Sequence, residues 1–146
     1  MGNGPGLAYS IDPAKRGDIT ESGKVWQYEE IHRSISTAAV GNGLAFLSDI
    51  DGVVHCLDAK TGKAYWTFDL KSPAWGSPLL ADGKVYLGDA DGDLAVFRAS
   101  SEMNKPTVLD MADSVYSTPV PANGVLYVMT RTQLYAITAP DSEPGK

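Results

Sequence analysis

The sequence repeats itself about every 40 residues, and this period limits the folds that the chain can adopt. A glycine that opens an apolar segment recurs at intervals of 40 and 41 residues, at Gly43, Gly83 and Gly124. A second segment recurs with it, as Val54-His55-Cys56-Leu57, Leu94-Ala95-Val96-Phe97 and Leu134-Tyr135-Ala136-Ile137. Trp26 precedes Trp66 by 40 residues, so a partial unit lies before the first full one. Such units bury their apolar faces by stacking on their neighbours.

Each full unit contains four short apolar segments separated by turn signals. In the first full unit they are residues 37–40, 44–48, 53–57 and 64–68. Asn42-Gly43 and Asp51-Gly52 lie between them, and such dipeptides between strand-like segments predict β-hairpins. Helical periodicity of useful length is absent. Four antiparallel strands in about 40 residues are what one blade of a β-propeller requires.

The units at the two ends are incomplete. The first supplies two strand-like segments joined by a polar connection, residues 12–22, and the last supplies three strands. We therefore expect an all-β fold, a partial β-propeller of roughly three four-stranded antiparallel blades. The expected division is a partial first blade with a polar insertion at 1–35, blades at 36–70 and 75–111, a three-stranded last blade at 115–139 and a flexible tail at 140–146. Open blade faces at both ends predict that further blades or other copies of the chain are its partners.

Composition and charge argue against several function classes. Twelve Lys and Arg against 18 Asp and Glu give a formal charge of −6, whereas a nucleic-acid surface needs a basic face. No segment approaches the roughly 20 apolar residues of a membrane span. Residues 1–6 lack the basic and apolar regions of a signal peptide. Cys56 is the single cysteine, so an intramolecular disulfide is excluded.

The segment from Asp58 to Trp66 predicts a turn followed by a strand with a large aromatic anchor. Gly62 can supply the positive φ that a tight turn often needs. Asp58 and Thr61 can bond the backbone of the turn. Trp66 offers a large apolar surface and one N–H donor, so we expect it to lie buried between two blades.

Residues 57–66, with the Gly-x-Val-Tyr-type strands and Asp-Gly hairpins, resemble the tryptophan-docking repeat of the pyrroloquinoline-quinone (PQQ)-like β-propellers. The resemblance covers roughly Leu7 to Thr138, and residues 31–37 and 75–78 look like the C-terminal part of larger bacterial proteins of this kind. The motif is complete only at 57–66; in the next unit residues 100–106 replace it and no tryptophan follows. The family includes PQQ-dependent dehydrogenases and non-catalytic scaffolds, such as the propeller lipoprotein of the bacterial outer-membrane assembly machinery. The resemblance implies an extracytoplasmic protein, periplasmic or secreted.

Three functions remain open on the sequence. The favoured one is a non-catalytic interaction scaffold, or a C-terminal fragment of one, with other proteins as partners. The alternative is the C-terminal portion of a PQQ-dependent dehydrogenase whose PQQ, calcium and catalytic residues lie in blades outside this chain. The third is a repeat fragment that self-assembles. We expect no enzymatic activity and no cofactor in this chain alone.

Two polar clusters are candidate sites. Alternating carboxylates in Asp89-Ala90-Asp91-Gly92-Asp93 resemble a Ca²⁺ loop, but no distal Glu follows, so we interpret the segment as a hairpin turn with solvated acids. His55 and Cys56 invite a metal or nucleophile interpretation, with His32 the only other histidine. Strand alternation sends the two side chains to opposite faces, which favours a packed cysteine and a histidine at the rim or on a face of a blade.

The three tryptophans, Trp26, Trp66 and Trp75, could stack on a planar quinone. We favour packing between blades for all three. No Gly-x-Ser-x-Gly elbow and no phosphate loop occur. We predict no catalytic and no metal residue, and the sequence identifies no cofactor-binding residue either way.

Overall fold

The computed structural model describes residues 5–139, and these residues form an all-β fold. They contain thirteen strands in four antiparallel sheets of two, four, four and three strands, as the apolar segments and turns of the sequence predict. The expected flexible tail at 140–146 lies outside the described residues. Within the described part of the chain there is no helix long and apolar enough to cross a membrane.

The four sheets follow the chain in order. The first sheet pairs β1 (Ala8–Ile11) with β2 (Lys24–Tyr28). The second contains β3 (Ala39–Gly41), β4 (Leu44–Ser48), β5 (Val53–Asp58) and β6 (Ala64–Asp69). The third contains β7 (Leu79–Ala81), β8 (Lys84–Gly88), β9 (Asp93–Arg98) and β10 (Thr107–Asp110). The fourth contains β11 (Val120–Ala122), β12 (Val125–Met129) and β13 (Leu134–Thr138).

Tight turns place the first two strands of each of the last three sheets side by side. Asn42 and Gly43 both have positive φ, 52° and 77°, and the equivalent pairs Asp82-Gly83 and Asn123-Gly124 repeat this geometry. Positive φ at both central residues is the type I′ turn, whose twist matches that of the flanking strands. The hairpins expected at these dipeptides are confirmed.

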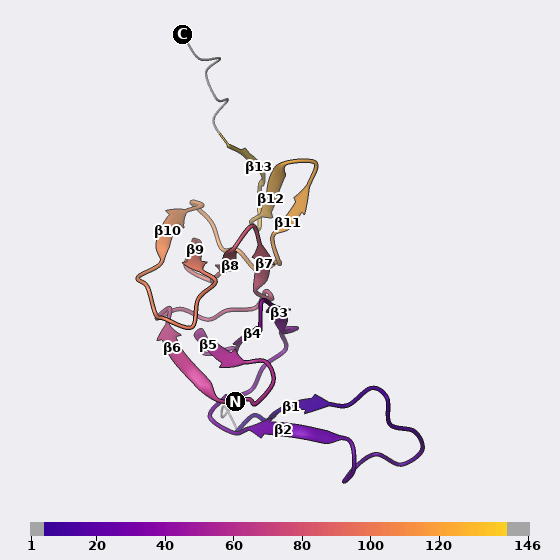
Figure 1. The fold of residues 1–146 in the computed structure, drawn as a ribbon. Coiled ribbons are helices and arrows are strands. Elements are labelled where there is room, and N and C mark those ends of the chain that lie inside the picture. The colour runs from indigo at the N-terminus through magenta and orange to yellow at the C-terminus, as the bar shows by residue number, and fades with distance from the viewer. Residues whose placement is uncertain (1–4, 140–146) are drawn as a thin grey trace.

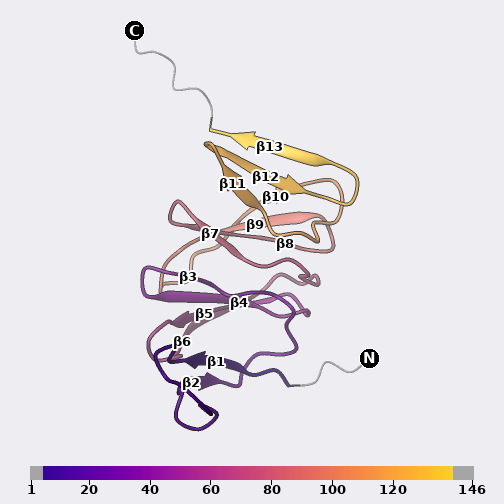
Figure 2. The same cartoon turned by 90° about the vertical axis from the view of Figure 1, so that its right-hand side faces the viewer.

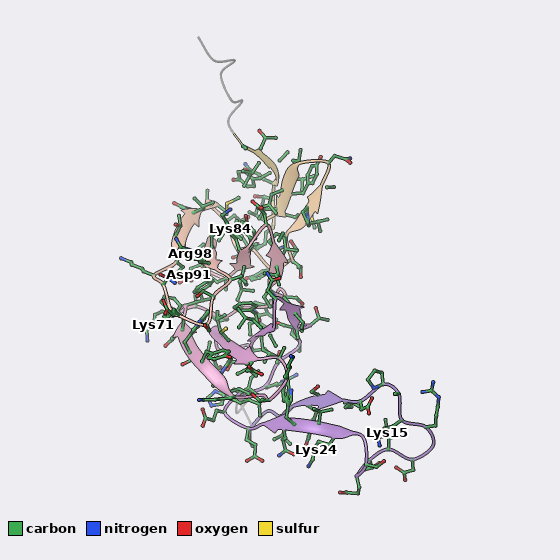
Figure 3. All side chains as sticks on the ribbon, in the orientation of Figure 1. Lys15, Lys24, Lys71, Lys84, Asp91 and Arg98 are labelled. Carbon is green, nitrogen blue, oxygen red and sulfur yellow. The ribbon has the colours of Figure 1, made fainter. Side chains whose placement is uncertain are left out.

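The sheets stack face to face in chain order, with the first sheet at one end and the fourth at the other (Figures 1 and 2). The β1–β2 hairpin projects sideways from the stack (Figure 1). Several basic side chains lie on the outside of the molecule: Lys15 and Lys24 on the projecting hairpin, and Lys71, Lys84 and Arg98 at the second and third sheets (Figure 3).

The core consists of three apolar layers, one between each pair of successive sheets. The largest joins the second and third sheets and includes Phe46, Trp66 and Phe97. A smaller layer includes Tyr28 and Leu57 and joins the first and second sheets. The remaining layer joins the third and fourth sheets. Each inner sheet is therefore apolar on both faces, and its stability depends on its neighbours.

Candidate interaction face and sheet interfaces

Trp66 lies in the interface between the second and third sheets, as the sequence predicts. Its side chain is 8% exposed. Its ring stacks on Phe97 with centroids 5.7 Å apart and an interplanar angle of 25°. The indole Nε1 donates a 2.9 Å hydrogen bond to the carbonyl oxygen of Ser100. The side chain therefore joins two sheets by apolar contact and by one directional bond.

Trp26 makes the corresponding contact between the first and second sheets. Its Nε1 donates a 3.0 Å hydrogen bond to the carbonyl oxygen of Ala59. The indole lies against Gly62, where an added Cβ would be only 2.6 Å from the ring. Gly62 also has a φ of 73°. Two features therefore require a glycine at this position: the positive φ of the turn and the close approach of the Trp26 ring.

Trp75 does not pack between sheets, and the expectation that it does so is wrong. It lies in the connection between β6 and β7, where it is exposed and meets Tyr116 edge to face with centroids 6.3 Å apart. Ile35 holds the equivalent place 40 residues earlier and is also exposed. We call Ile35, Trp75 and Tyr116 the loop row. The sequence carries the signal, since all three directly precede the Ser-Thr, Gly-Ser and Ser-Thr steps of the repeat.

The loops that carry the loop row are linked by hydrogen bonds that follow the repeat. Ser36 Oγ donates to the carbonyl of Gly76 at 2.8 Å, and the amide of Thr37 donates to Ser77 Oγ at 2.9 Å. The amide of Ser77 donates in turn to Thr118 Oγ1 at 2.9 Å. Three successive loops are thereby joined, so the loop row stands on an ordered support.

Each of these loops is also tied to a hairpin of its own sheet. Backbone amides at residues 50, 90 and 131 donate to carbonyls at residues 33, 73 and 114, with distances of 2.9, 2.8 and 3.1 Å. Gly76 approaches the next loop so closely that an added Cβ would lie 2.8 Å from the carbonyl oxygen of Ser117. The loops are therefore fixed both within and between sheets.

His55 is buried at 2% exposure on the face of the second sheet that the first sheet covers. The sequence led us to expect His55 either at the rim or on a face of a blade, and it lies on a face. Its Nδ1 is 3.0 Å from Tyr28 Oη, and its Nε2 is 3.4 Å from Asp49 Oδ2. A neutral imidazole with its proton on Nε2 satisfies both contacts. Burial lowers the pKa of His55, and the hydrogen bond to Asp49 opposes that shift. Sequence reasoning did not find these partners.

Cys56 points into the opposite interface, as strand alternation predicts, and is fully buried. Burial raises the pKa of its thiol to about 12. A nucleophilic or metal-binding cysteine acts as the thiolate. The geometry therefore fits a packed side chain and not a reactive one.

The Asp89–Asp93 segment is a turn closed by a buried carboxylate. Asp89 Oδ1 accepts hydrogen bonds from the amides of Asp91, Gly92 and Asp93, at 3.0, 3.1 and 3.0 Å. Asp89 is only 3% exposed, so the expectation of solvated acids is wrong for this residue. Burial raises the pKa of its carboxyl, against the lowering effect of the amides. Among residues 5–139, no group of three or more His, Cys, Asp or Glu side chains could hold a metal ion.

The equivalent residues confirm that this carboxylate has a structural role. Asp49 Oδ1 accepts from the amide of Val53 at 2.9 Å in the preceding sheet. Thr130 Oγ1 accepts from the amides of Thr132 and Gln133 in the following one. A buried oxygen thus closes the same hairpin in three successive sheets.

The family of the chain follows from comparison with known proteins. The sequence model of a family described as outer membrane protein assembly factor BamB matches residues 10–103. The chain belongs to this family. The fold is therefore a partial β-propeller built of PQQ-like repeats, as the resemblance implies.

Relatives of this BamB-like chain include both a dehydrogenase and an assembly factor. A 1-butanol dehydrogenase (cytochrome c) of Thauera butanivorans is 34% identical over 92 residues, which are 54% of this chain and 13% of the relative. Outer membrane protein assembly factor BamB of Yersinia pestis is 23% identical over 119 residues, which are 71% of this chain and 30% of the relative. The chain thus spans less than a third of the length of either relative.

The crystal structure of BamB from Moraxella catarrhalis has the same fold. It superposes with a TM-score of 0.66 and 19% identity, covering 78% of this chain and 40% of the BamB chain. At this identity the similarity establishes the fold and nothing further.

The tryptophans do not fit PQQ, the cofactor that the resemblance to PQQ-dependent dehydrogenases implies. The rings of Trp26 and Trp66 are packed against Gly62 and Phe97 inside sheet interfaces. Trp75 meets Tyr116 edge to face, so these two rings do not form a parallel slot between them for a planar quinone. The three tryptophans therefore do not form a stacking site for PQQ, and no step of PQQ chemistry is assigned to them.

Proposed function

We propose that this chain is a non-catalytic β-propeller scaffold, or one portion of such a scaffold, and that it binds other proteins. The observation that carries the proposal is the loop row, in which three exposed apolar side chains occupy equivalent places in successive repeats. The polar candidates have structural partners instead, as the contacts of His55 and Asp89 indicate.

An extended segment of another protein is the partner that fits the loop row best. Side chains on one face of a β-strand lie about 6.7 Å apart, close to the 6.3 Å between the ring centroids of Trp75 and Tyr116. A segment that alternates apolar and polar residues could place its apolar side chains along the row. Strands of outer-membrane barrels have this alternation, which agrees with the name of the assembly-factor relatives.

Fluorescence anisotropy with a labelled peptide tests this proposal. The probe is a segment of about ten residues that alternates Val and Thr, as barrel strands alternate apolar and polar residues, and the reference peptide has the same composition in scrambled order. We expect the alternating peptide to bind better, and Trp75→Ser and Tyr116→Ser each to weaken its binding about tenfold, or about 1.4 kcal/mol. Val108→Ser removes an exposed apolar side chain from β10 and should leave binding unchanged. Equal binding of the two peptides would contradict the proposal.

A second candidate is a portion of a PQQ-dependent dehydrogenase, favoured by the 34% identity with the butanol dehydrogenase. It is tested by mixing the chain with PQQ, Ca²⁺ and a panel of alcohols and sugars while dye reduction is followed. The scaffold proposal predicts no turnover above the protein-free control. Turnover that Asp91→Ala abolishes would favour the dehydrogenase.

We further propose an extracytoplasmic location, because the assembly-factor relatives are named for outer membrane proteins. The proposed units are blades at residues 36–70 and 75–111 and a three-stranded blade at 115–139. Limited proteolysis that cleaves within these units before the connections between them would argue against this division.

A further inference from the structure

The two ends of the stack expose apolar sheet faces that are covered everywhere else in the molecule. On the outer face of the fourth sheet, Leu134 is 66% exposed. Val54 and Leu94 hold the equivalent positions in the second and third sheets, and both are 0% exposed. Val120 and Met129 are exposed on the same outer face of the fourth sheet.

The first sheet exposes the opposite kind of face. Ile11 is 56% exposed, together with Tyr9 and Val25. Its equivalent in the second sheet is Leu57, which is 0% exposed. The equivalence is structural, because in both sheets the preceding residue pairs with the tryptophan and the register shifts directly after that pair.

Every interface inside the chain joins one forward face to one backward face. We define the forward face as the one turned toward the following sheet, where Val54 and Leu94 lie, and the backward face as the one where Leu57 and Phe97 lie. Val54 packs in one apolar cluster with Phe97. Leu94 packs in another with Ile137, the equivalent of Phe97 in the fourth sheet. Leu57 packs against the first sheet.

The two open faces are therefore one of each kind. The fourth sheet exposes a forward face around Leu134, and the first sheet exposes a backward face around Ile11. Each of the three interfaces inside the chain pairs a forward face with a backward face. A contact between two forward faces would therefore resemble none of them, whereas a contact between a forward and a backward face would resemble all three. A second copy of this chain carries a backward face of this kind, around its own Ile11.

We propose that the outer face of the fourth sheet in one copy packs against the outer face of the first sheet in a second copy. The contact is head to tail and continues the stack across the two molecules. Leu134 and Ile11 lie on the two sides of this contact. Contiguous exposed apolar patches mark interaction sites in soluble proteins.

Sedimentation velocity of the full chain over a wide concentration range tests the association. We expect wild type to self-associate, and Ile11→Glu and Leu134→Lys each to weaken association at least tenfold. Val108→Glu introduces the same negative charge as Ile11→Glu, but at an exposed position of β10. This control should associate as wild type does. A wild type that stays monomeric, or variants that associate as strongly as wild type, would overturn the proposal.

An equimolar mixture of Ile11→Glu and Leu134→Lys tests the head-to-tail direction. Each variant keeps one intact face, and the two altered faces carry opposite charges, so the mixture should associate more strongly than either variant alone. If two copies of the same face met instead, mixing would restore nothing, and the head-to-tail contact would be wrong.

Cross-linking covers the case in which a charged variant does not fold. Ile11→Cys and Leu134→Cys are milder changes, and the native Cys56 is buried. The mixture of these two variants should form a disulfide-linked dimer faster than either variant alone. Faster dimerisation of one variant by itself would contradict the head-to-tail contact.

Discussion

The indole Nε1 of Trp66 donates its hydrogen bond to the carbonyl oxygen of Ser100, which lies 34 residues later, in the connection between β9 and β10 of the next sheet. The same ring is covered by Phe97, so one side chain fixes both the distance and the orientation of two sheets. Trp26 repeats this arrangement one sheet earlier, with Ala59 as the acceptor.

Trp66→Ala should lower the free energy of unfolding by about 3–5 kcal/mol, the range for large-to-small aromatic changes in a core. Chemical denaturation followed by circular dichroism measures the change. Trp66→Phe keeps most of the apolar surface but removes the donor to Ser100, and it should cost less than the alanine variant. A denaturation midpoint for Trp66→Ala that barely moves would remove Trp66 from its place in the interface.

Gly62→Ala should be more destabilising than the same change at Gly43. Both glycines have positive φ, 73° and 77°, so each substitution carries a backbone cost of about 1–2 kcal/mol. Only at Gly62 would the new Cβ also meet the ring of Trp26, because nothing lies within 4 Å at Gly43. Urea denaturation of the two variants gives the difference. Equal losses would mean that Trp26 can move away without cost.

Much of the fold could be predicted from the sequence, because turn dipeptides and strand segments are local features. Asn42-Gly43 and its equivalents require positive φ whatever surrounds them, and the 40-residue period identifies the repeated unit. The burial of Trp66 followed from its size and from its place after a complete turn motif. These features are properties of single repeats.

The contacts between repeats were harder to predict. Alternation places His55 and Cys56 on opposite faces, but it does not say that Tyr28, 27 residues away, covers one of them. Trp75 lies in a connection and not in a strand, so alternation says nothing about it. Comparison of equivalent positions would have helped, since Ala95 holds the place of His55 in the next sheet and is also buried.

The stability of the chain should fall as the pH falls below about 6.5 because of His55. Burial lowers the pKa of this imidazole from 6.5, so the unfolded chain takes up the proton first and stability is lost as the pH falls through 6.5 toward the lower pKa of the folded state. The negative charges of Asp49 and Glu30 raise the pKa of His55 and so oppose this lowering, whereas His32 lowers it further. The remaining polar contact of the ring is the hydrogen bond with the Tyr28 hydroxyl.

Urea denaturation at about pH 7.5 and about pH 5.5, on either side of the ordinary histidine pKa, measures this dependence. His55→Gln removes the titrating group and should show a smaller loss of stability between the two conditions than wild type. His32→Gln removes the exposed histidine that contacts Asp51 and should keep most of the loss. A His55→Gln variant that loses as much stability as wild type would assign the pH dependence to other groups.

Asp89→Ala should destabilise the chain by about 1–3 kcal/mol, since it leaves buried donors without an acceptor. Three amides share one oxygen of this carboxylate. Asp91→Ala is the matched control, because Asp91 is exposed and contributes its backbone amide to the turn. Denaturation midpoints of the two variants should therefore separate clearly.

We expect the turn from Asp89 to Asp93 not to bind Ca²⁺. A Ca²⁺ site takes six to eight oxygen ligands, and one oxygen of the Asp89 carboxylate already accepts three amides of its own turn. Calorimetric titration should find no site tighter than about millimolar, the weak end of protein calcium sites. Micromolar binding that Asp91→Ala abolishes would mean that the turn opens to take the ion. The carboxylate would then close the hairpin only while no cation competes for it.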